Sequence, residues 1–197
     1  VNPSLPILYF GNLSLYKKSN LKIITVAKNP SDNEFRLSKN DKFSFVRFPI
    51  WETNKRNLIP TLNEYFERKP LNRWFSCFEP ILNGLSASFY NSNNKNTTLH
   101  TDICSPLATS PTWSKLDKKD QNLLFQEGFE IWKELIEELQ PDIMLVSIPF
   151  NLFKSIFGVN GKKFITFKNK KNGEQRKRPY IVELHEYKLN TGKKSKV

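Results

Sequence analysis

Three short, nearly continuous apolar runs recur along the chain and predict the central strands of a sheet. They occupy residues 21–27 (LKIITVA), 99–104 (LHTDIC) and 142–150 (DIMLVSIPF). Such runs are typical of strands that are buried on both faces, as in a parallel sheet. Each run ends in polar residues, and open α/β sheets place their functional groups at the carboxyl ends of parallel strands. We therefore expect the ends of these strands to converge.

A long amphipathic helix is predicted for residues 117–140. Its large apolar side chains recur at steps of four and three residues, which places them on one helix face. Pro141 ends the pattern, because proline interrupts helical hydrogen bonding. We interpret the apolar face as core packing. Shorter helices are predicted for residues 61–66, 79–89 and 151–157, and a structured loop for residues 35–51.

Two more strands, at residues 164–167 and 180–184, are joined by a basic segment with a turn at Asn172-Gly173. The alternation of strands and helices predicts an α/β fold, expected to be a three-layer sandwich with a central, mainly parallel four-stranded sheet. The 197 residues fit one domain, 1–197, with a core large enough to fold without disulfides. The chain begins with Val1 rather than Met, which leaves open that residues are missing at its termini.

The chain is strongly basic, with 31 Lys and Arg against 19 Asp and Glu and a formal charge of +12. Such an excess suggests a polyanionic partner, because each neutralised phosphate releases condensed counterions. The cations cluster between Lys162 and Arg178, and aromatic residues, which stack on unpaired bases, reach 13%. We predict that DNA is the partner and that its contacts include Lys170, Lys171, Arg176 and Lys177. Solvated lysines without a partner are the alternative.

The cysteine content and hydropathy predict a cytoplasmic protein. The two cysteines, Cys77 and Cys104, cannot build a disulfide framework, so free thiols in a reducing compartment are expected. No apolar run is long enough to cross a bilayer, and we expect neither a membrane partner nor an obligatory protein partner.

Polar residues with catalytic potential follow two of the predicted strands. Pro30 stops the first strand in a turn, Asn29-Pro30-Ser31, although this sequence is also common in ordinary turns. His100, Asp102 and Cys104 alternate, so an extended strand places them on one face, where they could bind a metal together with His185. A hydrogen-bonded His–Asp pair is the simpler interpretation. Glycine-rich phosphate loops and a serine nucleophile elbow are both missing from the sequence.

In their order and spacing, these motifs resemble the uracil-DNA glycosylase superfamily. The resemblance uses residues 27–31 (AKNPS) as the first motif, Asp102 in HTDICSPLA, the long helix followed by residues 141–148, and His185 at the end of YIVELH. It extends over most of residues 21–187 and indicates a divergent member with an Asn-Pro first motif. Two departures are Lys28 before the catalytic position and His185-Glu186-Tyr187 where the family has His-Pro-Ser. These departures leave the excised base and the mode of strand insertion unidentified.

The resemblance implies a DNA glycosylase that flips out a normal or modified base and hydrolyses its N-glycosidic bond, without metal or cofactor. By this resemblance Asn29 orients the attacking water and His185 donates to the leaving base. Asp102 accepts a hydrogen bond from an exocyclic amine of the base. Base-binding residues further include Ser31, with a nearby backbone amide, and the stacking rings Phe45 and Phe48.

Several alternatives remain open at the level of sequence. Asn29 could cap a turn, Asp102 could hold a histidine in place, and both phenylalanines could belong to the core. For the whole chain, the alternatives are a non-catalytic nucleic-acid-binding protein of the same fold and a metal-dependent nuclease that uses His100, Asp102 and His185.

Overall fold

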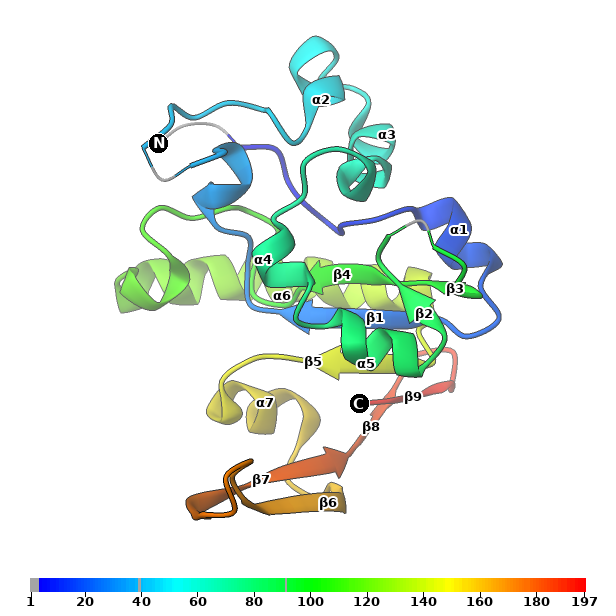
Figure 1. Ribbon diagram of the computed structural model, residues 1–197. Coiled ribbons are helices and arrows are strands. Elements are labelled where there is room, and N and C mark those ends of the chain that lie inside the picture. The colour runs from blue at the N-terminus through cyan, green and yellow to red at the C-terminus, as the bar shows by residue number, and fades with distance from the viewer. Residues whose placement is uncertain (1–3, 39, 91) are drawn as a thin grey trace.

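A mainly parallel sheet forms the centre of the molecule in the computed structural model, which describes residues 4–38, 40–90 and 92–197. Its five strands follow the spatial order β4–β1–β5–β9–β8 (Figure 1). Strands β4, β1, β5 and β9 are parallel neighbours, and β8 is antiparallel to β9. The strand bounds are β1 Ile23–Ala27, β4 Leu99–Asp102, β5 Ile143–Val146, β8 Glu186–Lys188 and β9 Lys194–Lys196. The α/β class and the mainly parallel sheet are thus confirmed, but the sheet has five strands rather than four, because the chain ends in a hairpin whose second strand joins β5.

Strand β1 is the middle of this sheet and is buried along its whole length. It pairs with β4 on one edge and β5 on the other, so that Thr25 lies opposite both His100 and Leu145. Neighbouring strands and the layers above and below cover all its side chains, which explains why its sequence is almost uninterrupted in apolar residues.

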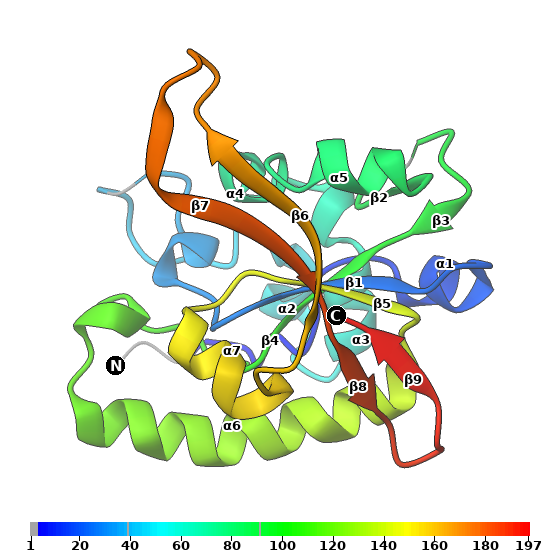
Figure 2. The ribbon, with the colours of Figure 1, turned by 90° about the horizontal axis from the view of Figure 1, so that it is seen from below.

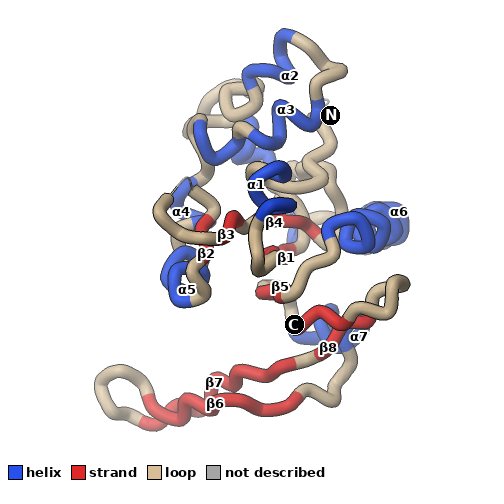
Figure 3. Tube along the Cα trace, turned by 90° about the vertical axis from the view of Figure 1, so that its right-hand side faces the viewer, coloured by secondary structure: helices blue, strands red, loops and turns tan. Residues whose placement is uncertain are grey.

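Helices lie on both sides of the sheet. Helix α6, Lys118–Leu139, runs along one side, and α4, Asn72–Phe75, and α5, Glu79–Gly84, lie on the other (Figures 2 and 3). Helix α7, Phe150–Phe157, lies on the α6 side (Figure 2). The shorter helices α1 Leu13–Lys18, α2 Pro49–Thr53 and α3 Leu58–Asn63 lie beyond the β4 edge (Figure 1).

Helix α6 has the bounds and the buried face that its periodicity predicts. The Asp117 carboxylate accepts a hydrogen bond from the backbone N–H of Asp120 at 2.8 Å and caps the first turn. Gln140 adopts a left-handed backbone and ends the helix. On the inner face, Trp132 and Ile136 are fully buried. Gly128 lies against the backbone of Cys104 and Ser105, where a Cβ atom would be only 2.2 Å from the Cys104 oxygen.

Some predicted elements differ from the structure. The helix predicted for residues 79–89 ends at Gly84, and the following residues form β2, Ala87–Ser88, which pairs in parallel with β3, Asn96–Thr97. The chain reverses after Gly84 through Ser86, whose φ of 54° is left-handed. The helix predicted for 61–66 is displaced toward the N-terminus as α3, followed by a 3-10 turn, η2, at Tyr65–Glu67.

A two-stranded antiparallel ribbon projects from the body of the molecule (Figures 1 and 2). It consists of β6, Lys162–Asn169, and β7, Gln175–Leu184, which extend beyond the strands predicted for this region. Every residue of β6 is exposed. We call this element the β6–β7 ribbon.

The core contains a cluster of aromatic rings next to the sheet. Phe10, Phe48, Tyr65 and Phe75 are almost completely buried, and their neighbouring ring centroids lie 4.7–5.5 Å apart. This cluster supports the side of the molecule on which β1 and β4 end. Within the described residues, no helix combines the length and the apolar character needed to cross a membrane.

Candidate active site

The segments that follow β1 and β4 are held together by backbone hydrogen bonds. Cys104 N–H donates to the Lys28 carbonyl at 2.7 Å, and Thr109 N–H donates to the Pro30 carbonyl at 3.3 Å. Ser31 forms an isolated parallel bridge with Thr109. The two strand exits therefore form one unit, and side chains on them keep fixed relative positions.

A cavity of about 270 Å³ opens at these strand exits. Its lining includes Asn29 and Ser31 after β1, Asp102 at the end of β4, and His100, Glu34 and Trp74. The volume is just below the range typical of pockets for drug-sized ligands, so it suits one small ligand or part of a larger one. Of the three residues expected to meet in one pocket, Asn29 and Asp102 line this cavity together with Ser31, whereas His185 does not.

The side chain of Asn29 is fixed by its amide nitrogen. Nδ2 donates to the backbone carbonyl of Pro30 at 2.7 Å and to the Thr109 hydroxyl at 3.0 Å. A carbonyl only accepts, so these contacts fix which atom of the amide is nitrogen. The opposite atom, Oδ1, makes no hydrogen bond within the described residues and is free to accept one from water.

Asp102 is buried and incompletely paired. Its side chain is only 2% exposed, and Oδ1 has no hydrogen-bond partner among the described residues. The nearest histidine nitrogen, His100 Nε2, is 3.7 Å from Oδ1, which is beyond hydrogen-bond distance. His100 is instead held through Nδ1, which lies 2.6 Å from the Thr25 hydroxyl. A buried carboxylate oxygen without a hydrogen-bond donor destabilises the folded protein. Oδ1 of Asp102 is therefore available to accept a hydrogen bond from a ligand.

Glu34 is a second buried carboxyl group in the lining, and it was not among the predicted site residues. It lies on η1, Asp32–Phe35, a 3-10 turn that follows the Asn29-Pro30 turn, and it is 4% exposed. The Tyr65 hydroxyl donates to Oε2 at 2.6 Å. Burial raises the pKa of Glu34 to about 7, and the nearby charge of Asp102 also raises it. The bond from Tyr65 and the charge of Arg47 lower this pKa, but less than burial raises it.

Aromatic rings from other elements complete the wall of the cavity. Phe10, Trp74 and Phe75 line it, and the Phe75 ring is 5.2 Å from the His100 ring, centroid to centroid. Trp74 is 39% exposed, so it has surface left to stack on a ligand. These rings come from the N-terminal segment and from α4.

Phe45 and Phe48 do not line this cavity. Phe48 is fully buried, and its ring packs against Phe35 and Tyr65 with centroids 5.5 Å away in both cases. Phe45 is half-buried and packs edge-on against Phe35 and Phe43. The assignment of both as stacking residues is therefore corrected: Phe48 is a core residue, and Phe45 packs at the margin of the same cluster.

His185 lies away from the cavity, contrary to the expected convergence. It precedes β8 and lines a separate, mostly apolar groove between β5, α7 and the β6–β7 ribbon. Its ring packs edge-on against Phe153 at 4.8 Å between centroids, and Nε2 is 3.3 Å from Glu183 Oε2. The ring is also pressed against Gly161, where any side chain would collide with it. This packing joins the base of the ribbon to the body of the molecule.

The predicted DNA-contacting residues belong to the β6–β7 ribbon. Lys170 and Lys171 follow β6, and Arg176 and Lys177 lie near the start of β7. All but Arg176 are exposed, and the Arg176 guanidinium stacks on the Tyr180 ring at 4.0 Å. Lys170 forms an exposed ion pair with Glu174 at 2.7 Å. The ribbon therefore combines exposed positive charges with exposed aromatic rings.

Metal ligation and thiol chemistry find little support at the site. Among the residues that the structure describes, no three or more His, Cys, Asp or Glu side chains form a group that could hold a metal ion. Cys104 is buried, which raises the pKa of its thiol to about 12, and the charge of Asp102 adds to this effect. A thiol with such a high pKa is neither a good nucleophile nor a ready metal ligand at neutral pH.

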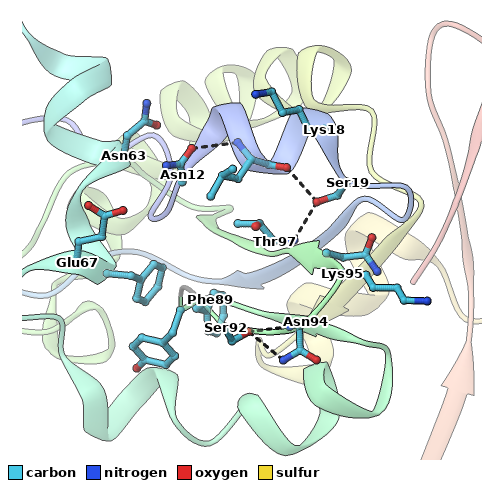
Figure 4. A pocket seen from close by; sticks show the side chains of 14 residues that line it. Asn12, Lys18, Ser19, Asn63, Glu67, Phe89, Ser92, Asn94, Lys95 and Thr97 are labelled. Atoms are coloured by element: carbon cyan, nitrogen blue, oxygen red, sulfur yellow. Dashed lines mark hydrogen bonds between the residues drawn. The ribbon is translucent and has the colours of Figure 1, made fainter.

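Another cavity, of about 250 Å³, lies between α1, η2 and β3 (Figure 4). Its polar groups serve local structure: Asn12 accepts from Leu15 N–H and caps α1, and the Ser19 hydroxyl accepts from Thr97 N–H at 2.8 Å. In the described part of the chain, the buried polar side-chain atoms without partners belong to Arg47, Thr98 and Asp102, none of which lines this cavity. We assign it no role.

Comparisons with models of protein families, with curated proteins and with solved structures found no match to this chain.

Proposed function

We propose that this chain is a DNA glycosylase that flips out a normal or modified base and hydrolyses its N-glycosidic bond. The observation that carries the proposal is the cavity at the ends of β1 and β4. It contains the amide oxygen of Asn29 and a buried oxygen of Asp102, neither of which has a hydrogen-bond partner among the described residues. The Asn29 oxygen can position water, and the Asp102 oxygen can accept a hydrogen bond from an amino group of a base. As part of the same proposal, the domain is a three-layer sandwich and the protein is cytoplasmic, as expected from the sequence.

The chemistry follows from these positions. Departure of a base leaves an oxocarbenium-like sugar, which water attacks. In the proposed complex the Asn29 oxygen orients this water, and Asp102 accepts a hydrogen bond from the exocyclic amine. The exposed face of Trp74 stacks on the extruded base, in place of Phe45 and Phe48. The proposed reaction uses no metal and no cofactor.

DNA binding is assigned to the β6–β7 ribbon. Eight cations and one acid occur between Lys162 and Arg178, and this strongly positive segment projects from the body (Figure 1). Cations at the end of a projecting ribbon can approach phosphates without bringing the whole surface into contact. A two-stranded ribbon also fits the major groove of B-DNA.

A non-catalytic nucleic-acid-binding protein is the second candidate. The position of His185 outside the cavity favours it, because the family's histidine is then not available to the leaving base. The metal-dependent nuclease is disfavoured, because it requires His185 beside His100 and Asp102.

One screen separates these functions. Single- and double-stranded oligonucleotides, each with one modified base, are incubated with the protein either in excess chelator or with a divalent cation. Strand cleavage is then scored with and without alkali treatment. We expect alkali-dependent cleavage at one class of base, unaffected by chelator. Binding without cleavage would favour the non-catalytic protein, and cleavage that needs a divalent ion and no alkali would indicate a nuclease.

A further inference from the structure

A glycosylase reaction in this cavity requires a source of protons. Breaking the bond between C1′ and the base nitrogen leaves the electron pair on the base, and a nearby acid accelerates its departure. His185 lies in another groove. The titratable side chains that line the cavity are Lys28, Glu34, His100 and Asp102.

Among these groups, Glu34 has the surroundings of a positioned acid. The backbone N–H of Leu71 donates to the Tyr65 hydroxyl at 2.9 Å, and that hydroxyl donates its own proton to Glu34 Oε2. This chain of bonds fixes the carboxyl group through one oxygen. The other oxygen, Oε1, has no hydrogen bond to any described residue.

The burial of Glu34 favours its protonated form near neutral pH. Burial is the main cause and raises its pKa to about 7, and the negative charge of Asp102 acts in the same direction. Tyr65 and Arg47 oppose this shift. Glu34 shares the cavity with His100 and Lys28.

We propose that Glu34 is a catalytic residue that donates a proton to the leaving base, while Asp102 accepts a hydrogen bond from an amino group of that base. This inference rests on the proposed glycosylase function. As the C1′–N bond breaks, its electrons go to the base, and the Glu34 proton is transferred to the base. Water adds its oxygen to C1′, and the proton that it loses restores Glu34 directly or through solvent. The net reaction consumes one water and yields the free base and an abasic site.

Together, Glu34 and Asp102 also define the class of base that the cavity would accept. Asp102 requires a hydrogen-bond donor, and protonated Glu34 requires an acceptor. Cytosine-like and adenine-like bases present an amino group next to a ring nitrogen acceptor. Uracil-like bases have a carbonyl where Asp102 requires a donor, so they fit the pair poorly.

The first test compares the wild-type chain with Glu34→Gln on duplexes that carry cytosine-like or adenine-like modified bases. Glutamine retains the size of the side chain but has no acidic proton. We expect the single-turnover rate of Glu34→Gln to fall 10²- to 10⁴-fold. The wild-type rate should decline as the pH rises through about 7, because Glu34 then loses its proton. A rate that rises over this range would indicate a base instead and would overturn the assignment.

The second test moves the pKa of Glu34 without changing its carboxyl group. Tyr65→Phe removes the hydrogen bond that lowers this pKa, so the decline in rate should shift to higher pH. Tyr16→Phe is the matched control, since Tyr16 is a buried tyrosine whose hydroxyl donates to the Leu139 carbonyl rather than to Glu34. A purely structural role of Glu34 predicts equal profiles for both variants. Should Glu34→Gln fail to fold, the shift of the pH–rate profile in Tyr65→Phe tests the role of Glu34 by itself.

The outcomes also separate this inference from the proposed function. If the wild-type chain excises no base, both fail. If it excises a base while Glu34→Gln keeps the wild-type rate, or Tyr65→Phe the wild-type profile, only the role of Glu34 fails.

Discussion

The buried Asp102 oxygen, Oδ1, has no partner in the described part of the chain, and this carries an energetic cost for the fold. An unsatisfied buried acceptor costs about 1–3 kcal/mol, and more when it is charged. Asn29, on the neighbouring strand exit, donates both protons of its amide nitrogen, and its amide oxygen accepts no hydrogen bond from the residues that the structure describes. At the residue scale, the two groups therefore offer acceptors to a ligand rather than to the protein, which is the arrangement expected of a binding site.

Asp102→Asn should change which base is preferred. The amide adds a donor, so preference should move toward a uracil-like edge, and discrimination against the original base should change by about 1–3 kcal/mol. Single-turnover rates on cytosine-like and uracil-like substrates measure this change. Equal losses on both substrates would mean that Asp102 has a structural role and does not contact the base.

Glu34 should make the stability of the fold depend on pH. Its pKa is raised from 4.5 to about 7, so between these values the folded chain holds a proton that the unfolded chain releases. The free energy of unfolding should therefore fall as the pH rises from 4.5 to 7, by on the order of 3 kcal/mol, and level off above 7.

Urea unfolding of the wild type and Glu34→Gln across this range checks the prediction, because the difference between the two chains isolates Glu34 from the other carboxyl groups. A constant difference would show that Glu34 is ionised in the folded protein.

Part of the candidate site was predictable from the sequence, and the remaining residues reach it through tertiary packing. Asn29, Ser31 and Asp102 were predictable, because strand exits in a parallel sheet share one edge. Glu34 and Trp74 were missed, since burial next to other acids or rings depends on tertiary packing. A carboxyl group five residues after Asn29, followed by Phe35, was the available sequence signal. His185 was misplaced because the strand before it became part of the ribbon.

At the scale of elements, the positive charge of the β6–β7 ribbon leads to a prediction about DNA binding. Neutralising Lys170, Lys171, Arg176 and Lys177 should weaken DNA binding and flatten its dependence on salt, by about one unit of slope per lost phosphate contact. Binding titrations at several salt concentrations measure the slope.

The matched control neutralises four lysines elsewhere, Lys17, Lys18, Lys118 and Lys119, which are exposed and carry the same total charge. An equal loss of slope in both variants would mean that net charge, and not the ribbon, governs binding.

The contact between α6 and the end of β4 gives a prediction about stability. Gly128→Ala places a Cβ 2.2 Å from the Cys104 carbonyl oxygen, so the backbone must move, at a cost of about 1–3 kcal/mol. Gly84→Ala in α5 is the control, since a Cβ there meets no atom within 4 Å, and alanine favours the helix by about 0.5–1 kcal/mol. Chemical denaturation should thus show a lower free energy of unfolding for Gly128→Ala and a higher one for Gly84→Ala. A neutral Gly128→Ala would contradict the close packing.

Elements with a strong period were predictable, and short ones were not. Helix α6 and the strands β1, β4 and β5 were expected close to their observed places because their patterns are long or uninterrupted. Strands β2, β3, β8 and β9 have only two or three residues each, too few for a pattern. The helix predicted for residues 79–89 stopped early because Gly84 weakens it and the chain turns into β2.

At the scale of the whole molecule, the central position of β1 affects how the protein is made. Thr25 meets His100, which lies 75 positions later, and Lys22 meets Asp142, which lies 120 positions later. On the ribosome, β1 is synthesised before β4 and β5, and it has neither of its partner strands until these later segments have emerged. Closing such long loops is slow, and an apolar strand with open edges invites aggregation while it waits. The segment that builds the proposed catalytic cavity is therefore also the one that most needs protection during synthesis.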